Sequence, residues 1–118
     1  MSYFKEANSL YYLKNYKDAL YLYEKAIMSN ENEAASLYNA GVCFIKLQEY
    51  ENAITYLKKA VQKKSESKYY FNLGYCYAML KDSKKALIYF NKAWSLNDKD
   101  DDCSKAINII LNSYQTKI

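Results

Sequence analysis

Side chains that carry out catalysis or bind metal ions are scarce in this sequence. Histidine is absent, and the three cysteines, Cys43, Cys76 and Cys103, form no CxxC pair. There is also no phosphate-binding loop, no pair of carboxylates on one helical face and no cysteine beside a suitable base. We therefore expect no enzymatic activity, cofactor or metal site, and we interpret the cysteines as reduced, buried small residues.

Every basic side chain is a lysine. The 17 basic and 13 acidic residues give a net charge of +4, and only Lys58, Lys59, Lys63 and Lys64 form a dense group. Lysine lacks the planar guanidinium fork that recognises phosphate and guanine through two hydrogen bonds. Interspersed charges of this kind are typical of solvated helix faces, so nucleic acid is not an expected partner.

The first residues do not have the pattern of a targeting signal. Lys5 and Glu6 stand where a signal peptide needs an apolar stretch, and no run approaches the ~18 apolar residues of a membrane span. Together with the unpaired cysteines, this predicts a reducing, cytoplasmic environment and no membrane insertion.

The composition predicts helices. The chain has 118 residues, 51% of them hydrophobic and 25% charged, which fits one small globular domain. It contains no proline and only two glycines, Gly41 and Gly74. Because tight turns and hairpins depend on these residue types, an all-α fold is favoured.

An internal repeat is the strongest pattern in the chain. A single offset aligns Gly41 with Gly74 and Cys43 with Cys76. A nearly identical offset places the earlier segment LKNYKDALYLYEKAI over LQEYENAITYLKKAV. The chain thus contains three units of similar length, which indicates a repeat protein.

Each unit has the spacing of a helical hairpin. Apolar residues recur at intervals of three and four in two stretches separated by a polar break. Asn15, Gln48-Glu49 and Asp82-Ser83 stand at these breaks, where N-capping groups are expected. The predicted helices span residues 2–14, 16–29, 33–47, 50–64, 67–80, 83–96 and 102–115.

Small and bulky residues are placed as two closely packed helices require. We expect the small residues to permit close approach of the backbones and the bulky ones to fill the space beside them. The small set is Gly41, Ala53, Ala60, Gly74, Ala86 and Ala93, and the bulky set is Phe44, Leu57, Tyr77 and Phe90.

The third unit contains Asn72, Leu73, Gly74, Tyr77, Ala86, Phe90 and Ala93. A Leu-Gly pair followed by a tyrosine and by spaced alanine and aromatic residues resembles the signature of the tetratricopeptide repeat (TPR) family. The second unit follows the signature closely. The first departs from it, with Glu6-Ala7 in place of Leu-Gly.

The resemblance implies the architecture of the chain. It predicts an all-α, right-handed superhelical array of antiparallel helix hairpins, a TPR-like α-solenoid with seven helices. The chain would form a single domain over residues 1–118, with repeats at about 2–33, 34–66 and 67–100.

The segment after the third repeat looks like the solvating helix that often closes such arrays. Asp100, Asp101 and Asp102 stand at its start, where negative charge is favourable. Covering the open end of the third hairpin would give the array a capping face. The alternative is a segment that docks into a partner or a second copy. Its predicted apolar stripe is Ala106, Ile107, Ile110 and Leu111.

In proteins of this family, the first helix of each hairpin lines a concave groove that holds a peptide or a partner helix. The resemblance therefore implies an adaptor that binds a protein segment, and aromatic residues are typical anchors of such interfaces. The implied groove residues are Phe4, Lys5, Asn8, Tyr11 and Tyr12 in the first unit, Tyr38, Asn39, Val42, Ile45 and Lys46 in the second, and Lys68, Phe71, Asn72, Tyr75 and Met79 in the third.

Self-association is the main alternative function. The chain contains 15 tyrosines, so aromatic groove positions could reflect composition alone. A short array could also fill its groove with a second copy of itself, as a self-associating scaffold or an assembly module in a larger complex.

A carboxylate clamp is the less favoured alternative. One subclass of the family clamps the C-terminal carboxylate of heat-shock chaperones with lysines, asparagines and other basic residues. Asn8, Asn39 and Lys68 match three of the five clamp positions, whereas Phe4 and Asn72 occupy two of the basic ones. Losing these cations weakens charge-assisted binding of a carboxylate.

Overall fold

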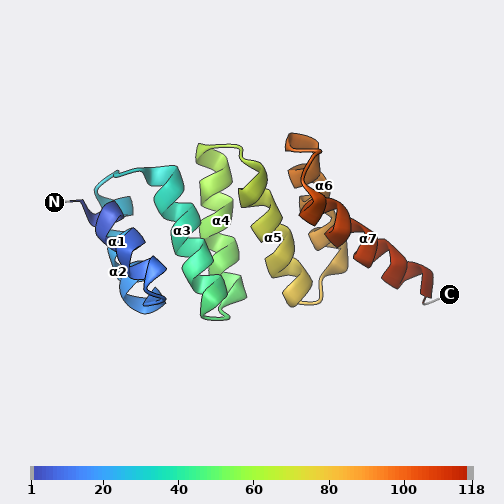
Figure 1. Cartoon of the computed structure of the whole chain (residues 1–118), viewed down its shortest axis with the longest axis horizontal. Helices are drawn as coiled ribbons and strands as arrows, with labels where there is room; N and C mark the ends of the chain where they lie inside the picture. The colour runs from blue at the N-terminus through green and yellow to red at the C-terminus, as the bar shows by residue number, and fades with distance from the viewer. Residues whose placement is uncertain (1, 117–118) are drawn as a thin grey trace. The chain divides into compact units, whose positions relative to one another are not determined.

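Seven α-helices make up the described part of the chain (Figure 1). The structure is a computed structural model that describes residues 2–116 and the side chains of residues 2–113. No strand occurs within residues 2–116, which agrees with the all-α prediction. The helices are α1 (Tyr3–Tyr12), α2 (Tyr16–Met28), α3 (Glu33–Lys46), α4 (Tyr50–Lys63), α5 (Ser67–Met79), α6 (Ser83–Leu96) and α7 (Asp101–Thr116).

The chain divides into two compact units. The first ends at Ser65 and contains α1 to α4, and the second begins at Glu66 and contains α5 to α7. Within each unit, consecutive helices pack as antiparallel hairpins: α1 with α2 and α3 with α4 in the first unit, and α5 with α6 in the second (Figure 1).

The core of the first unit lies among α1, α2 and α3. Ala7, Ala19 and Ala40 are fully buried there, together with Tyr23 and Cys43. The alanines let the helices approach closely, and the Tyr23 ring fills the space between them. Ala7 aligns with the glycine of the next repeat, so a small residue serves the same purpose in the first hairpin although the Leu-Gly pair is missing.

Gly41 and Gly74 lie where two helices cross, as predicted. A Cβ atom on Gly41 would lie 2.8 Å from Leu57 Cγ, and one on Gly74 would lie 2.7 Å from Phe90 Cδ1. Carbon atoms in contact stay about 3.5–4.0 Å apart, so even a methyl group would displace the facing side chain. The predicted small alanines Ala53, Ala60, Ala86 and Ala93 are all fully buried.

Helix α7 packs against α6 in the second unit. Cys103 is fully buried and Ile110 is 8% exposed, whereas Leu111 is 43% exposed. The predicted stripe is therefore wrong at Leu111. A seven-residue spacing places Cys103 and Ile110 on one helical face, while Leu111 is turned a further step around the helix.

The hairpin turns use the same backbone geometry without glycine. Lys14, Gln48 and Lys81 all have left-handed φ angles, between 62° and 65°. In the α3–α4 turn the Glu49 N–H donates to the Phe44 carbonyl at 2.8 Å, and the Gln48 N–H donates to the Ile45 carbonyl at 2.9 Å. This pair of bonds is the Schellman motif, which ends helices at a left-handed residue.

The helix N-termini are capped only in part as predicted. Asp82 accepts a hydrogen bond from the Lys85 N–H at 3.1 Å. Asn15 and Glu49 make no side-chain cap. The Asn15 amide instead donates to Asp18 Oδ2 at 2.8 Å, because an amide placed beside a first-turn carboxylate can satisfy that group rather than the backbone.

Glu31 caps α1 from the turn between α2 and α3. Its Oε1 accepts hydrogen bonds from the Ser2 hydroxyl and, at 3.0 Å, from the Phe4 N–H. These bonds lower the pKa of the Glu31 carboxyl below its ordinary value, the Ser2 bond most strongly. The carboxylate also lies at the positive end of the α1 dipole.

Candidate functional site

Two asparagines of the implied groove meet between α1 and α3. Asn39 Nδ2 donates to Asn8 Oδ1 at 3.3 Å, and the Tyr23 hydroxyl of α2 donates to the same oxygen. Tyr23 is 1% exposed, and burial raises the pKa of its hydroxyl. The neutral Tyr23 hydroxyl therefore donates a hydrogen bond that holds the side-chain oxygen of Asn8 toward the protein interior.

The aromatic residues of α1 differ in exposure. The Phe4 ring lies 6.1 Å from the Tyr23 ring, and Tyr11 makes edge contacts with Tyr12 and Tyr16 at 5.8 and 5.5 Å. Phe4 and Tyr11 both pack against the core. Tyr12 is 81% exposed, so it is the aromatic residue of α1 with the largest fraction of its surface available to a partner.

The other implied residues of the first unit lie along α1 and α3. Lys5 and Lys46 are exposed. Tyr38, Val42 and Ile45 are half-buried on α3. Helices α1 and α3 thus present a mixed surface of amide, aromatic, aliphatic and lysine side chains.

In the second unit the implied residues lie on α5. Phe71 packs against Phe90 with ring centroids 5.2 Å apart. Part of its surface is therefore buried inside the hairpin. The Asn72 amide donates to the Lys68 carbonyl at 3.0 Å. Tyr75 and Met79 are 37% and 44% exposed, so these two offer the accessible apolar surface of this helix.

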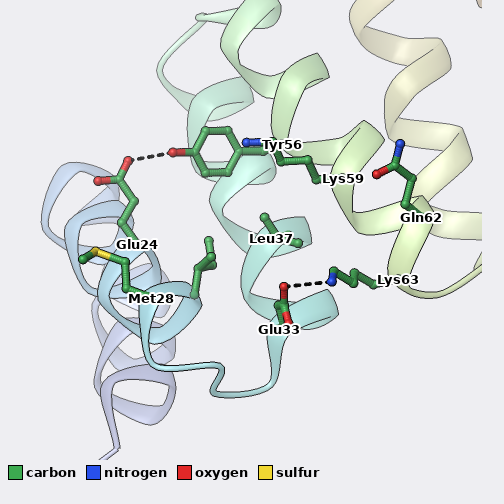
Figure 2. A pocket seen from close by; sticks show the side chains of 9 residues that line it. Glu24, Met28, Glu33, Leu37, Tyr56, Lys59, Gln62 and Lys63 are labelled. Carbon is green, nitrogen blue, oxygen red and sulfur yellow. Dashed lines mark hydrogen bonds and ion pairs between the residues drawn. The ribbon is translucent and has the colours of Figure 1, made fainter.

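The first unit also contains a pocket that the sequence analysis did not predict. It has a volume of about 460 Å³ and lies among α2, α3 and α4 (Figure 2). We name it the α2–α4 pocket. Its lining consists of Glu24, Ile27, Met28, Glu33, Leu37, Tyr56, Lys59, Gln62 and Lys63.

Two interactions between helices border the α2–α4 pocket (Figure 2). The Tyr56 hydroxyl donates to Glu24 Oε1 at 3.1 Å, and Lys63 Nζ lies 3.2 Å from Glu33 Oε1. Burial, and then the Glu24 charge, raises the pKa of Tyr56. Tyr56 therefore stays a neutral donor, and its bond links α2 to α4.

The sequence did contain a signal for this pocket. Tyr56, Lys59 and Lys63 recur at intervals of three and four on α4, as Glu24, Ile27 and Met28 do on α2. Such spacing places each set on one helical face. Their amphipathic pattern predicts only helix packing, and the folded chain brings their two faces to one pocket.

The thiols are not arranged for chemistry. Burial raises the pKa of Cys43 and Cys76 to about 12 and that of Cys103 to about 11. All three are free and buried, as predicted, so they are protonated and poorly reactive at neutral pH.

Among the described residues, no group of histidine, cysteine or acidic side chains could hold a metal ion. No helix within that part of the chain is both long and apolar enough to cross a membrane.

Repeated hairpins with close helix crossings define a helical-repeat protein. Two sequence profiles, both described as tetratricopeptide repeat, match residues 4–68 and 67–100. The chain belongs to the tetratricopeptide repeat family, whose fold is a protein-interaction fold. No curated protein shows significant sequence similarity to it.

Solved TPR structures share the fold. The first TPR of Spaghetti (RPAP3), bound to the HSP90 peptide SRMEEVD, has a TM-score of 0.91 at 16% identity, covering 96% of this chain and 90% of that one. The Arabidopsis OM64 TPR domain has a TM-score of 0.89 at 22% identity, covering 94% and 93%. YrrB, a TPR protein with an unusual peptide-binding site, has a TM-score of 0.85 at 26% identity, and the match covers 95% of this chain but 58% of YrrB.

Proposed function

We propose that this chain is a protein-interaction adaptor that binds a peptide or a partner helix. The proposed contact surface lies on α1 and α3 in the first unit, and on α5 in the second unit taken by itself. These are the first helices of three repeats, for which we propose bounds of about 2–33, 34–66 and 67–100 within one domain closed by α7. The free buried thiols favour a reducing, cytoplasmic setting.

The proposed contact residues combine amides, aromatics, aliphatics and lysines. Aromatic side chains bury a large area with few torsions to freeze, and amides can hydrogen-bond a peptide backbone. The set is Phe4, Lys5, Asn8, Tyr11, Tyr12, Tyr38, Asn39, Val42, Ile45, Lys46, Lys68, Phe71, Asn72, Tyr75 and Met79.

The hydrogen bond between Asn39 and Asn8 is the observation that carries this proposal. It joins members of the proposed set on two different helices, 31 residues apart in sequence. Tyr23 holds the shared oxygen from below. A partner would therefore meet two amides with restricted side-chain freedom, which lowers the entropy lost on binding.

Peptide complexes of other TPR domains support the proposal. The second TPR domain of human RPAP3 was solved in complex with the HSP70 peptide SGPTIEEVD, and its TM-score to this chain is 0.85 at 21% identity. The first TPR of Spaghetti (RPAP3) was solved with an HSP90 peptide. The same fold thus binds peptides in those proteins.

A pull-down from host lysate with exposed aromatic variants tests the proposal. We expect Tyr12→Ala combined with Tyr75→Ala to lose partners that the unmodified protein retains, because both side chains are exposed members of the proposed set. Tyr21→Ala is the matched control, since Tyr21 is 59% exposed but lies on α2. Partners kept by the double variant, or lost equally from the control, would contradict the assignment of the site.

Two further measurements separate the alternatives. The free-carboxylate peptide SRMEEVD should bind no more tightly than its C-terminally amidated form even at low salt, because Phe4 and Asn72 replace two clamp cations. A strong preference for the free carboxylate would favour the carboxylate clamp. Sedimentation analysis that finds a dimer, disrupted by the Tyr12→Ala and Tyr75→Ala changes, would favour a self-associating scaffold.

A further inference from the structure

We propose that the α2–α4 pocket is a second peptide-binding site, distinct from the proposed contact residues on α1, α3 and α5, and that it takes an apolar side chain flanked on one side by acidic residues. The pocket lies wholly within the first unit. Its occupant is a protein segment that lays the apolar side chain on the pocket floor and its carboxylates toward α4.

The floor of the pocket is apolar. Leu37 is 4% exposed, and the half-buried Ile27 also lines the pocket. Met28 also lines the pocket (Figure 2). It is an apolar side chain, yet it is 83% exposed. A flexible thioether can close over an incoming leucine-sized group and adapt to its shape. The floor therefore favours a large aliphatic anchor.

The α4 wall of the pocket is basic. Two of its lining residues are lysines, Lys59 and Lys63, and none of the lining residues on α4 is acidic. Lys59 Nζ lies 5.8 Å from the centre of the Tyr56 ring. This cation–π contact involves no carboxylate, so the Lys59 ammonium can still attract an acidic group. Lys63 pairs with Glu33, with both side chains partly exposed. A carboxylate on the α4 side is thus the complementary charge.

The α2 wall limits acidic residues to one side of the apolar anchor. Glu24 accepts a hydrogen bond from the Tyr56 hydroxyl and places a carboxylate at this wall of the pocket. Acidic residues on that side of the anchor would meet like charge, which opposes binding. The segment therefore carries its acids on one side of the apolar residue and neutral residues on the other.

The repeat supplies a matched control position. Lys92 aligns with Lys59 in the next repeat. It also stands over a tyrosine ring, with its Nζ 5.7 Å from the centre of Tyr70. Lys59→Glu and Lys92→Glu thus make the same charge change in the same kind of contact, but only the first alters the α2–α4 pocket.

Nuclear magnetic resonance titration of the full chain tests this inference. The probe is the peptide SSLEEES, acetylated and amidated so that it carries no terminal carboxylate. We expect saturable amide shifts centred on Ile27, Leu37 and Tyr56. Replacing the peptide's leucine with serine or its glutamates with lysine should weaken binding about tenfold or more, since each removes one of the two complementary contacts.

Variants of the protein complete the test. Lys59→Glu should weaken SSLEEES binding about tenfold, whereas Lys92→Glu should change it less than about twofold. Met28→Glu, at a highly exposed position, should give a loss similar to that of Lys59→Glu. Shifts confined to residues outside the pocket, such as Asn8, Tyr12 and Tyr75, would overturn the proposal. So would equal binding of the serine peptide, equal losses in the two lysine variants, or no saturable binding at millimolar peptide.

Discussion

Buried small side chains determine how closely the helices of each hairpin approach. Ala53 and Ala86 are fully buried opposite the glycine-containing helices. We expect Ala53→Leu or Ala86→Leu to lower the free energy of unfolding by about 1–3 kcal/mol, because the added carbons overpack the crossing. Urea denaturation measures the effect.

An exposed position on α4 provides the control for that change. Thr55→Leu adds carbon atoms on the solvent side of the same helix as Ala53. Its effect should stay within about 0.5 kcal/mol. If the Ala53 and Ala86 variants were as stable as this control, the close helix crossing would be wrong.

At the scale of the secondary-structure element, the hairpin turns contain backbone strain that a substitution by glycine can remove. Gln48 adopts φ 62° at the end of α3, and a side chain disfavours this left-handed conformation. Gln48→Gly should therefore raise the free energy of unfolding by about 0.5–1 kcal/mol, after the added flexibility of the unfolded chain is subtracted. Thermal unfolding should show an increase of a few degrees.

The same substitution inside a helix should have the opposite sign. Gln62 is exposed in the last turn of α4, where glycine costs up to about 1 kcal/mol relative to good helix formers. Gln62→Gly is thus the matched control for Gln48→Gly. Destabilisation by both changes would contradict the left-handed turn.

The link from Glu31 to the start of α1 predicts a pH dependence. The hydrogen bonds of its carboxylate lower its pKa below the ordinary value of 4.5. A lowered pKa in the folded state adds stability above pH 4.5 that is lost as the pH falls through the folded value. The stability difference between the unmodified protein and Glu31→Gln should therefore shrink between pH 6 and pH 3.

Chemical denaturation across that pH range measures the Glu31 effect. Glu51→Gln is the control, because Glu51 is an exposed glutamate in the first turn of α4. A constant stability difference between the unmodified protein and Glu31→Gln across the range would show that the carboxylate does not cap α1.

At the scale of the whole chain, α7 completes the second unit. Removing the chain from Asp101 onward would uncover the surface of α6 on which α7 packs and would remove the buried Cys103 and Ile110. We expect a loss of at least about 2 kcal/mol in the stability of the second unit, or aggregation, since each buried aliphatic side chain contributes about 1.5–3 kcal/mol. Calorimetry or circular dichroism follows the change.

Two adjacent isoleucines separate capping from a general effect of truncation. Ile110 is 8% exposed and Ile109 is 69% exposed. Ile110→Ala should destabilise the protein by about 2 kcal/mol or more, and Ile109→Ala should be nearly neutral. A truncated chain as stable as the full one would instead favour a tail that docks elsewhere.

The sequence by itself determined the helices and their pairing. Intervals of three and four residues set the amphipathic faces, and the repeat offset set the hairpins, so every predicted helix boundary lies within two residues of the structure. The crossings at Gly41 and Gly74 could also be predicted, because only small residues fit where two backbones approach.

Only the tertiary structure decided which side chains face solvent and which pack inside the protein. Phe4 and Phe71 look equivalent to Tyr12 in a groove pattern, yet both pack inward against aromatic partners from other helices. The Glu31 cap and the α2–α4 pocket likewise join residues that are far apart in the sequence. Local periodicity identifies the face of a helix, but contacts between distant segments determine which residues of that face remain accessible to a partner.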